Sequence, residues 1–206
     1  MTHRLADDFG RMDIYLFDLL LREVVRPGHR ILDAGCGDGR NLQYLLKAGF
    51  DVHAVDRDPT AVAAARELAA RLVPGFPEEG AMRFIQAEVD ALPYPDARFD
   101  VVLSSAVLHF ARSGDHFRGM LNEMWRVLAP GGLLWARLAS NIGIEDRVRP
   151  LGSGRYTLPD GSDRFLVTED LLLTETDRLG GALVDPVKTT NVQGIRCMTT
   201  WVVRKR

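Results

Sequence analysis

The chain has few cysteines, little net charge and no long apolar run. Its 206 residues include only Cys36 and Cys197, which excludes a disulfide framework. A formal net charge of −2 argues against a surface built mainly to hold nucleic acid. No apolar segment reaches the length that spans a membrane, and the residues after Met1 lack the apolar core of a secretory signal. We therefore expect a cytoplasmic protein without a membrane or nucleic-acid partner.

The composition is that of an ordinary globular protein. Hydrophobic residues make up 46% of the chain and charged residues 26%, so it is not a disordered sequence. A length of 206 residues suits one domain with its own core. No internal repeat is visible. We expect residues 1–206 to form a single domain, as a monomer or a homodimer.

The most informative segment is a glycine-rich turn after a short apolar strand. Gly35, Gly37 and Gly39 follow the strand 31–34, and an apolar-periodic segment begins at Arg40. Such a unit brings backbone N–H groups close to a nucleotide-like ligand. In a dinucleotide fingerprint the third glycine comes three residues after the second, at the position that Arg40 occupies here. The spacing therefore disfavours a dinucleotide.

A second strand end carries an acid where a nucleoside site needs one. Asp56 ends the alternating strand 51–56, roughly 20 residues beyond the glycine turn, where an acid is expected to bind ribose hydroxyls. A carboxylate suits a cis-diol because it can accept two hydrogen bonds at once.

Four segments then match one family in order. The pattern D-x-G-x-G-x-G at 33–39 resembles the first motif of class I S-adenosylmethionine-dependent methyltransferases. Residues 84–94 resemble the segment with an acid, a small residue and Leu-Pro-aromatic, and 99–110 resemble the fourth strand and its loop. Residues 126–135 resemble the R-x-L-x-P-G-G-x-L turn into the fifth strand. The chain is most similar to methyltransferases of type 11/25 and, more loosely, to the tellurite-resistance methyltransferases.

The resemblance implies an α/β fold, a three-layer Rossmann-like sandwich. Its sheet has seven mostly parallel strands in the order 3-2-1-4-5-7-6, with an antiparallel C-terminal strand. The sequence agrees, because strand and helix signals alternate through the first 140 residues. The apolar runs 31–34, 99–103 and 133–138 are typical of strands buried on both faces. Segments 182–190 and 196–203 predict a hairpin.

Other boundaries follow from local signals. Apolar residues from Phe9 to Val24 lie at helical spacing and predict one amphipathic helix in an N-terminal helical lid, 1–27. Asp58-Pro59 and Thr168 predict helix starts, and a third helix is expected to stop at 130–132. Pro186 predicts an edge position or a bulge. Residues 140–167 show no clear periodicity, and we expect a long connection that serves as a substrate loop.

The resemblance implies S-adenosyl-L-methionine as cofactor and a set of residues that hold it. Asp56 is expected at the ribose, while either Glu88 or Asp90 meets the adenine amino group and Val89 offers its N–H to the ring. Asp33 either positions the methionine amino group or organises the glycine turn. Ser104 is expected near the methionine portion. The full cofactor set is Asp33, Gly35, Cys36, Gly37, Gly39, Asp56, Arg57, Glu88, Val89 and Ser104.

The candidates on the acceptor side are His109 and Tyr15. His109 follows the fourth strand and is either a base or substrate contact, or a histidine packed beside Phe110. Tyr15 either covers the site from the N-terminal helix or lies at the helix edge. Four arginines of the loop 140–167 either meet an anionic acceptor or are solvated: Arg147, Arg149, Arg155 and Arg164. We expect no metal.

The predicted activity is methyl transfer to a small-molecule acceptor by in-line displacement. Since the donor carries an activated methyl group, the protein needs mainly to position a nucleophile. A protein that binds the cofactor without catalysis remains an alternative, because cofactor motifs do not prove turnover. A nicotinamide-dependent oxidoreductase is a third hypothesis, which the glycine spacing disfavours.

Overall fold

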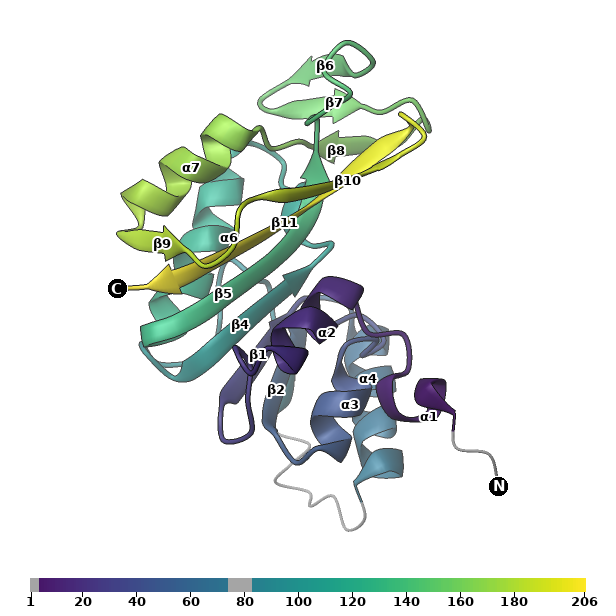
Figure 1. Cartoon of the computed structure of the whole chain (residues 1–206), viewed down its shortest axis with the longest axis vertical. Helices are drawn as coiled ribbons and strands as arrows, with labels where there is room; N and C mark the ends of the chain where they lie inside the picture. Colours follow the sequence, from purple (N-terminus) through teal and green to yellow (C-terminus); the bar gives the residue numbers. More distant parts are fainter. Residues whose placement is uncertain (1–3, 74–82) are drawn as a thin grey trace.

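The computed structural model describes residues 4–73 and 83–206. Helices and strands follow one another along the chain (Figure 1). The helices are α1 (Leu5–Phe9), α2 (Ile14–Leu21), α3 (Leu42–Lys47), α4 (Pro59–Leu72), the 3-10 helix η1 (Leu108–Phe110), α6 (Gly114–Val127) and α7 (Glu169–Arg178). The strands are β1 (Arg30–Ala34), β2 (Asp51–Asp56), β3 (Phe84–Gln86), β4 (Phe99–Ser105), β5 (Leu128–Ser140), β6 (Arg149–Gly152), β7 (Arg155–Thr157), β8 (Asp163–Phe165), β9 (Gly181–Leu183), β10 (Lys188–Val192) and β11 (Arg196–Lys205).

The main sheet has the predicted order. Its strands run β3-β2-β1-β4-β5-β11-β10, and β11 is antiparallel to β5 and β10. The predicted α/β fold and the order 3-2-1-4-5-7-6 are therefore confirmed. Strand β9 also pairs with β11. Pro186 lies between β9 and β10 at this edge, where a residue without an N–H interrupts no central ladder.

Helices cover both faces of the sheet (Figure 1). One apolar cluster joins α2, α3 and α4 to Val101 and Leu103 of β4, and the other joins α6 and α7 to Val102. Because successive side chains of a strand point to opposite faces, a strand buried on both sides must be apolar throughout. This explains the continuous apolar runs in the sequence.

The parallel pairing brings the glycine turn to the end of β2. Ala34 lies opposite Val55 in the β1–β2 ladder, and the N–H groups of Gly35 and Cys36 both donate to the Val55 carbonyl at 2.8 and 2.9 Å. Strand β1 lies between β2 and β4, so the chain order reverses at β1. Ligands of open parallel sheets bind beyond the carboxyl ends of the strands at such a point.

The N-terminal segment differs from its prediction. The single helix expected between Phe9 and Val24 is two helices, α1 and α2, because Gly10 has a φ of 60° and ends the first. Asp13 then starts the second, since its side chain accepts a hydrogen bond from the Tyr15 N–H. Hydrophobic spacing continues across this break, so periodicity alone did not reveal it.

Residues 140–167 also differ from the irregular connection that we expected. They contain a three-stranded antiparallel sheet, β6-β7-β8, which we call the cap sheet. Leu158 and Leu166 pack on Ala139 of β5 in a small core of their own. The turn between β6 and β7 needs positive φ at Gly152 and Gly154, and a Cβ on Gly154 would lie 2.3 Å from the Phe165 ring. Strands of three or four residues are too short for a visible alternation.

The other helix starts agree with the sequence. Asp58 accepts the Thr60 N–H and Pro59 is the first residue of α4, while Thr168 accepts the Leu171 N–H at the start of α7. Helix α6 ends at Val127, slightly before the predicted Pro-Gly-Gly stop. Among the residues described, no helix is both long and apolar enough to cross a membrane.

Candidate functional site

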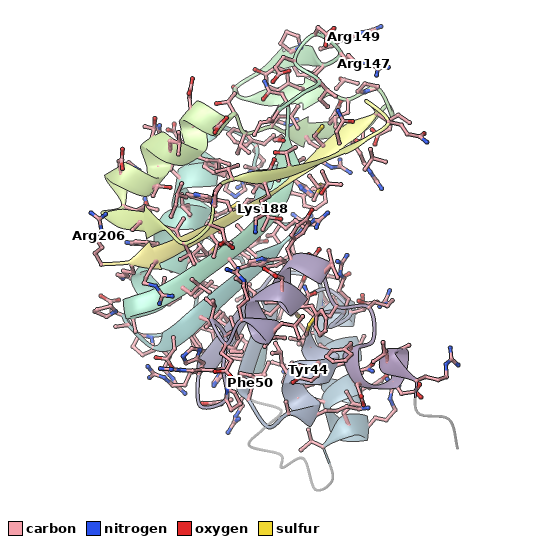
Figure 2. All side chains as sticks on the ribbon, in the orientation of Figure 1. Tyr44, Phe50, Arg147, Arg149, Lys188 and Arg206 are labelled. Atoms are coloured by element: carbon pink, nitrogen blue, oxygen red, sulfur yellow. The ribbon has the colours of Figure 1, made fainter. Side chains whose placement is uncertain are left out.

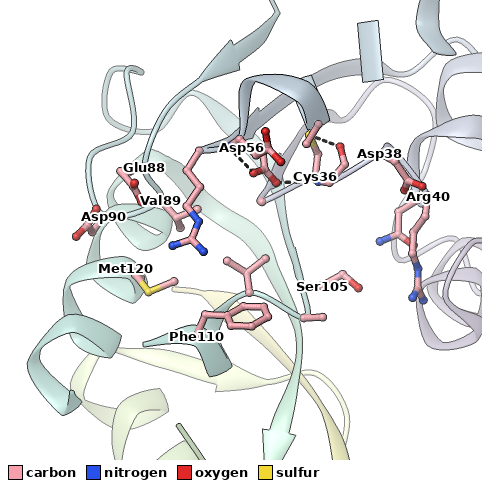
Figure 3. Close-up of a pocket in the computed structure, with 18 of the residues that line it drawn as sticks. Cys36, Asp38, Arg40, Asp56, Glu88, Val89, Asp90, Ser105, Phe110 and Met120 are labelled. Atoms are coloured by element: carbon pink, nitrogen blue, oxygen red, sulfur yellow. Dashed lines mark hydrogen bonds between the residues drawn. The ribbon is translucent and has the colours of Figure 1, made fainter. Parts of the chain in front are cut away.

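A cavity of about 460 Å³ opens beyond the carboxyl ends of β1, β2 and β4 (Figure 3). Its volume is in the range of small-molecule sites. Three groups of residues form its wall: the glycine turn, the loops after β2 and β3, and the segment after β4 together with α6. The wall comprises Gly35, Cys36, Gly37, Asp38, Arg40, Asn41, Asp56, Arg57, Asp58, Ala61, Glu88, Val89, Asp90, Ser105, Ala106, Val107, Phe110, His116 and Met120.

The three glycines of the turn serve two different purposes. All have positive φ, at 85°, 53° and 81° for Gly35, Gly37 and Gly39. A Cβ on Gly35 would lie 2.3 Å from Cγ2 of Val107, and one on Gly39 would lie 2.9 Å from Leu68. A Cβ on Gly37 would meet no atom within 4 Å. The outer glycines therefore permit close packing, whereas Gly37 keeps the cavity open beside its backbone.

Asp56 is fixed by the backbone of the two loops that it joins. Its Oδ2 accepts the Gly37 N–H at 2.9 Å and its Oδ1 accepts the Asp58 N–H at 3.0 Å. Each carboxylate oxygen can accept more than one hydrogen bond, so both retain capacity toward the cavity. An acid held in this way can bind two neighbouring hydroxyl groups.

Two carboxylates lie at one end of the cavity. Figure 3 shows Glu88 and Asp90 on the side opposite Arg40, and Asp56 lies between these two acids and Arg40. Asp90 Oδ2 is 3.4 Å from Nε2 of His116, whereas Glu88 has no side-chain partner in the part of the chain that the structure describes. Both predicted acids thus reach the wall, and Glu88 is the one that remains free for a ligand.

Three predicted cofactor residues lie behind the wall. Asp33 is only 1% exposed, and neither carboxylate oxygen finds a hydrogen-bond partner among the described residues. Burial, and secondly the charge of Asp56, raises the pKa of Asp33 to about 7. Ser104 is buried as well, and the next residue, Ser105, forms the wall. Gly39 packs on α4.

Cys36 lines the cavity as a thiol. It is 6% exposed, and its Sγ donates to the Gly37 carbonyl at 3.5 Å. Burial raises the pKa of Cys36, so the thiolate that a nucleophile needs is disfavoured. Its place in the turn is that of a small side chain.

His109 is buried beside the cavity and does not line it. Its Nδ1 accepts the Ala139 N–H at 3.2 Å, and its ring meets Phe110 edge-on. Burial lowers the pKa of His109 to about 4, so the ring is neutral at physiological pH. The neighbouring Phe110 is 50% exposed and forms part of the wall.

Tyr15 belongs to a group of polar side chains next to the cavity. We call this group the Asp13 cluster, and its members are Asp13, Tyr15, Arg40, Arg137 and Thr190. The Tyr15 hydroxyl is 2.9 Å from Oγ1 of Thr190, and the Arg137 guanidinium lies 5.0 Å from the Tyr15 ring centroid. Buried Asp13 pairs with Arg137 at 3.2 Å and with Arg40 at 3.1 Å. Because Arg40 lines the cavity, this cluster connects α2 to its wall.

The four arginines of residues 140–167 have separate positions. The Arg164 guanidinium lies 4.9 Å from the Phe110 ring centroid, so it touches a residue of the cavity wall. Arg147 and Arg149 project from the outer end of the molecule in Figure 2. Arg155 is half-buried in β7. Only Arg164 of the four is placed to meet a ligand of this cavity.

Several wall residues escaped the sequence analysis. Asp38, Arg40 and Asn41 lie within the glycine-turn motif, so their sequence position was a usable signal. His116 and Met120 come from α6 and reach the cavity only through helix packing, which no local pattern reveals. In residues 4–73 and 83–206, no group of three or more His, Cys, Asp and Glu side chains is arranged to hold a metal ion.

Comparisons with known proteins agree with this geometry. The profile of the methyltransferase domain family matches residues 32–136, about half of the chain. The uncharacterized methyltransferase YodH of Bacillus subtilis is 37% identical over 128 residues, which are 62% of this chain and 47% of that protein. A malonyl-[acyl-carrier protein] O-methyltransferase of Enterobacter lignolyticus is 32% identical over 116 residues, 56% and 41% of the two chains. The match thus spans about half the length of these relatives or less.

A solved structure shows the same fold. The crystal structure of 1,6-didemethyltoxoflavin-N1-methyltransferase from Burkholderia thailandensis, with bound 1,6-didemethyltoxoflavin and S-adenosylhomocysteine, superposes with a TM-score of 0.69 at 24% identity. The superposition covers 96% of this chain and 79% of that one. With the matched profile, the strand order and the glycine turn, the chain belongs to the methyltransferase domain family and to its class I, S-adenosylmethionine-dependent members.

Proposed function

We propose that this protein transfers the methyl group of S-adenosylmethionine to a nucleophile on a small-molecule acceptor. The observation that carries the proposal is the position of Asp56, whose two oxygens are fixed by the backbone of Gly37 and Asp58 at the cavity wall. A nucleoside needs such an acid for its ribose. The open side of Gly37 leaves room for the ligand beside it.

The residues present fit the donor. Asp56 would hold the ribose hydroxyls, and the unpaired Glu88 would accept from the adenine amino group. Val89 and Met120 offer apolar surface at the same end of the cavity. When bound, the donor supplies a methyl group on a sulfonium, which needs no redox partner or metal.

The chain's own contribution is position and the exclusion of water. Orientation of two reactants can supply roughly 7–11 kcal/mol of the barrier, so a methyltransferase does not require a catalytic dyad. Phe110 and Val107 form an apolar part of the wall, and the Asp13 cluster fixes α2 beside it. Neutral, buried His109 supports this arrangement through its bond to Ala139 and takes up no proton near pH 7.

The relatives point to varied acceptors. One carries the name of an O-methyltransferase for malonyl-[acyl-carrier protein] and another that of an N1-methyltransferase for a toxoflavin precursor. We propose a small-molecule acceptor with an O, S, N or C nucleophile. Arg164 over Phe110 places a cation at the wall, which suits an acceptor that is anionic and planar.

Two alternatives have less support. A nicotinamide-dependent oxidoreductase would use the dinucleotide glycine spacing and a sheet ordered 3-2-1-4-5-6. Here the glycines are closer together, and antiparallel β11 stands between β5 and β10. A cofactor-binding protein without catalysis has the same donor site, so only turnover separates it from the enzyme.

The test is transfer of label from methyl-labelled S-adenosylmethionine to a panel of carboxylic acids, phenols, thiols, amines and nitrogen heterocycles. We expect one class to accept label, with kcat/KM at least tenfold lower in Asp56→Ala. Asp51→Ala is the matched control, since Asp51 begins the same strand at its far end and lies outside the cavity wall. Donor binding without transfer to any class would instead identify the non-catalytic binder.

A further inference from the structure

Charge is unevenly distributed around the cavity. Among the described residues five carboxylates line it, and all of them come from the glycine turn or from the loops after β2 and β3. They are Asp38, Asp56, Asp58, Glu88 and Asp90. The segment after β4 adds only uncharged wall residues, namely Ser105, Ala106, Val107 and Phe110. Phe110 lies across the cavity from Asp56 in Figure 3, so the acids leave this side of the wall apolar.

Positive charge is in excess beyond the acidic side. The Asp13 cluster and Arg164 together hold three guanidinium groups and one carboxylate. That carboxylate is buried and already pairs with both Arg40 and Arg137. Arg164 forms no ion pair within residues 4–73 and 83–206, and its Nη1 donates instead to the backbone carbonyl of Asp163 at 2.7 Å. Arg164 is therefore the cation of this group that remains for an anionic ligand.

The fold holds the Arg164 guanidinium in place at the wall. It lies 4.9 Å from the ring centroid of Phe110, whose side chain is 50% exposed and lines the cavity. The next residue of β8, Phe165, is buried and stacks on Phe117 of α6 with the ring centroids 5.0 Å apart. Because the guanidinium is fixed before a ligand arrives, less conformational freedom is lost on binding, and more of the pairing energy remains as affinity.

Two titratable neighbours of Arg164 leave its charge available. The pKa of Asp160 is lowered mainly by hydrogen bonds from Ser162, and the charge of Arg164 contributes least. His109 packs against Phe110, and burial together with the charge of Arg164 lowers its pKa to about 4. The histidine is therefore neutral near pH 7 and adds no second cation. Among the described residues no carboxylate neutralises Arg164.

We propose that Arg164 is a specificity-determining residue of the acceptor site and binds the carboxylate of an aromatic acid whose ring lies against Phe110 and Val107. This inference rests on the proposed function and names its substrate class. A guanidinium binds a carboxylate through two parallel N–H···O bonds, and a neutral carboxamide of the same shape can accept only one of them. The apolar side chains beside the guanidinium favour an acid that carries a ring.

The carboxylate is then the group that is bound, and a second substituent of the acceptor receives the methyl group. Pairing with Arg164 engages lone pairs of the carboxylate, which makes it a poorer nucleophile than a free phenolate, thiolate or amine. In the transfer this second group forms the new bond to the methyl carbon. The carbon–sulfur bond breaks with its electron pair left on sulfur, and the proton of the nucleophile goes to solvent. The product keeps its carboxylate.

The test is calorimetric binding of hydroxybenzoates to the protein loaded with S-adenosylhomocysteine. The ortho, meta and para isomers are each compared with their own carboxamide, which has the same shape without the charge. We expect at least one acid to bind with a Kd about tenfold or more below that of its carboxamide, because only the acid pairs with Arg164. In Arg164→Gln the ratio of the two Kd values should fall below about threefold.

Two further variants separate the geometry of the side chain from its charge. Arg164→Lys keeps the charge but loses the planar fork, so it should retain only part of the preference for the acid. Arg149→Gln removes an exposed arginine of the same cap sheet, which projects from the outer end of the molecule in Figure 2, and should keep the wild-type ratio. All three variants should bind S-adenosylhomocysteine within about twofold of the wild type, since none of them alters the acidic side of the cavity.

The outcomes separate this inference from the proposed function. If S-adenosylhomocysteine binds but no acid binds more tightly than its carboxamide, or if the preference persists in Arg164→Gln, the role of Arg164 is overturned. Tighter binding of phenyl phosphate than of every hydroxybenzoate would overturn the carboxylate in favour of a phosphate. An acid that accepts label from methyl-labelled S-adenosylmethionine should give an alkali-stable product, whereas labelled methanol released by alkali would show methylation of the carboxylate itself. If S-adenosylhomocysteine does not bind the wild type, the proposed function is wrong.

Discussion

The donor side of the cavity and its rim are built in different ways. The donor side consists of the glycine turn, Asp56 and the loop at 88–90, and its hydrogen bonds join backbone N–H groups to strand-end acids. The rim, by which we mean the Asp13 cluster with Phe110 and Arg164, consists of side chains from segments far apart in the sequence. The first is specified by short motifs and the second only by the folded chain.

This difference explains what the sequence predicted. The starts of α4 and α7 and the positions of Gly37 and Asp56 follow from local patterns, and the structure has them as predicted or brings them to the cavity. The sheet order, which the structure also has as predicted, followed from the resemblance to the family. Parallel strands place their carboxyl ends at one edge of the sheet. The motifs that follow these strands can therefore be predicted to lie side by side, although each is recognised from its local sequence alone.

The rim was beyond such reasoning. The contact between Tyr15 and Thr190 spans most of the chain, and the pairing of Asp13 with Arg137 depends on where α2 packs. The break at Gly10 was hidden because hydrophobic spacing continues across it. The substitutions below separate the two regions, beginning with the largest expected effect.

Gly35→Ala should disrupt the donor side most. The new Cβ would lie 2.3 Å from Cγ2 of Val107, at a φ of 85° that alanine tolerates poorly. Overpacking and backbone strain together should lower the free energy of unfolding by about 2–4 kcal/mol. Urea denaturation measures this loss. The double variant Gly35→Ala/Val107→Ala should recover part of it; no recovery would show that the contact with Val107 is not its cause.

Asp13→Asn should be the largest change at the rim. Asparagine still caps α2, but it removes the negative charge that pairs with Arg40 and Arg137. We expect a loss of about 1–3 kcal/mol, as for hydrogen bonds to charged groups at a buried position. The control is Asp18→Asn on the same helix, whose pair with Arg22 is exposed and should matter by less than about 0.5 kcal/mol. Equal losses in thermal or urea unfolding would refute the special role of Asp13.

Gly37→Ala and Gly49→Ala form a matched pair. Both residues have positive φ, 53° and 76°, and a Cβ would meet no atom at either position, so each variant should lose about 1 kcal/mol of stability. Only Gly37 lines the cavity. Gly37→Ala should therefore raise the calorimetric Kd for S-adenosylhomocysteine at least tenfold, while Gly49→Ala should bind it with the wild-type Kd. Equal affinities in the two variants would place the ligand elsewhere.

Tyr15→Phe should have the smallest effect. It removes the hydroxyl that meets Thr190 and keeps the ring beneath Arg137. Loss of one partly buried hydrogen bond should cost about 0.5–1.5 kcal/mol of stability. Because the Tyr15 hydroxyl bonds to Thr190 and not to a residue of the donor side, the Kd for S-adenosylhomocysteine should stay within twofold of the wild-type value. A tenfold higher Kd would show that the rim contributes to donor binding, against the distinction between the two regions.

The most direct test of a nucleoside-binding donor site is calorimetric titration with S-adenosylhomocysteine and, separately, NADH, using the wild type, Asp56→Ala and Asp51→Ala. We expect micromolar binding of S-adenosylhomocysteine, unchanged in Asp51→Ala and at least tenfold weaker in Asp56→Ala, a loss of about 1.4 kcal/mol or more. NADH should not bind. Clear binding of NADH without binding of S-adenosylhomocysteine would contradict the methyltransferase assignment and leave the glycine turn serving a dinucleotide.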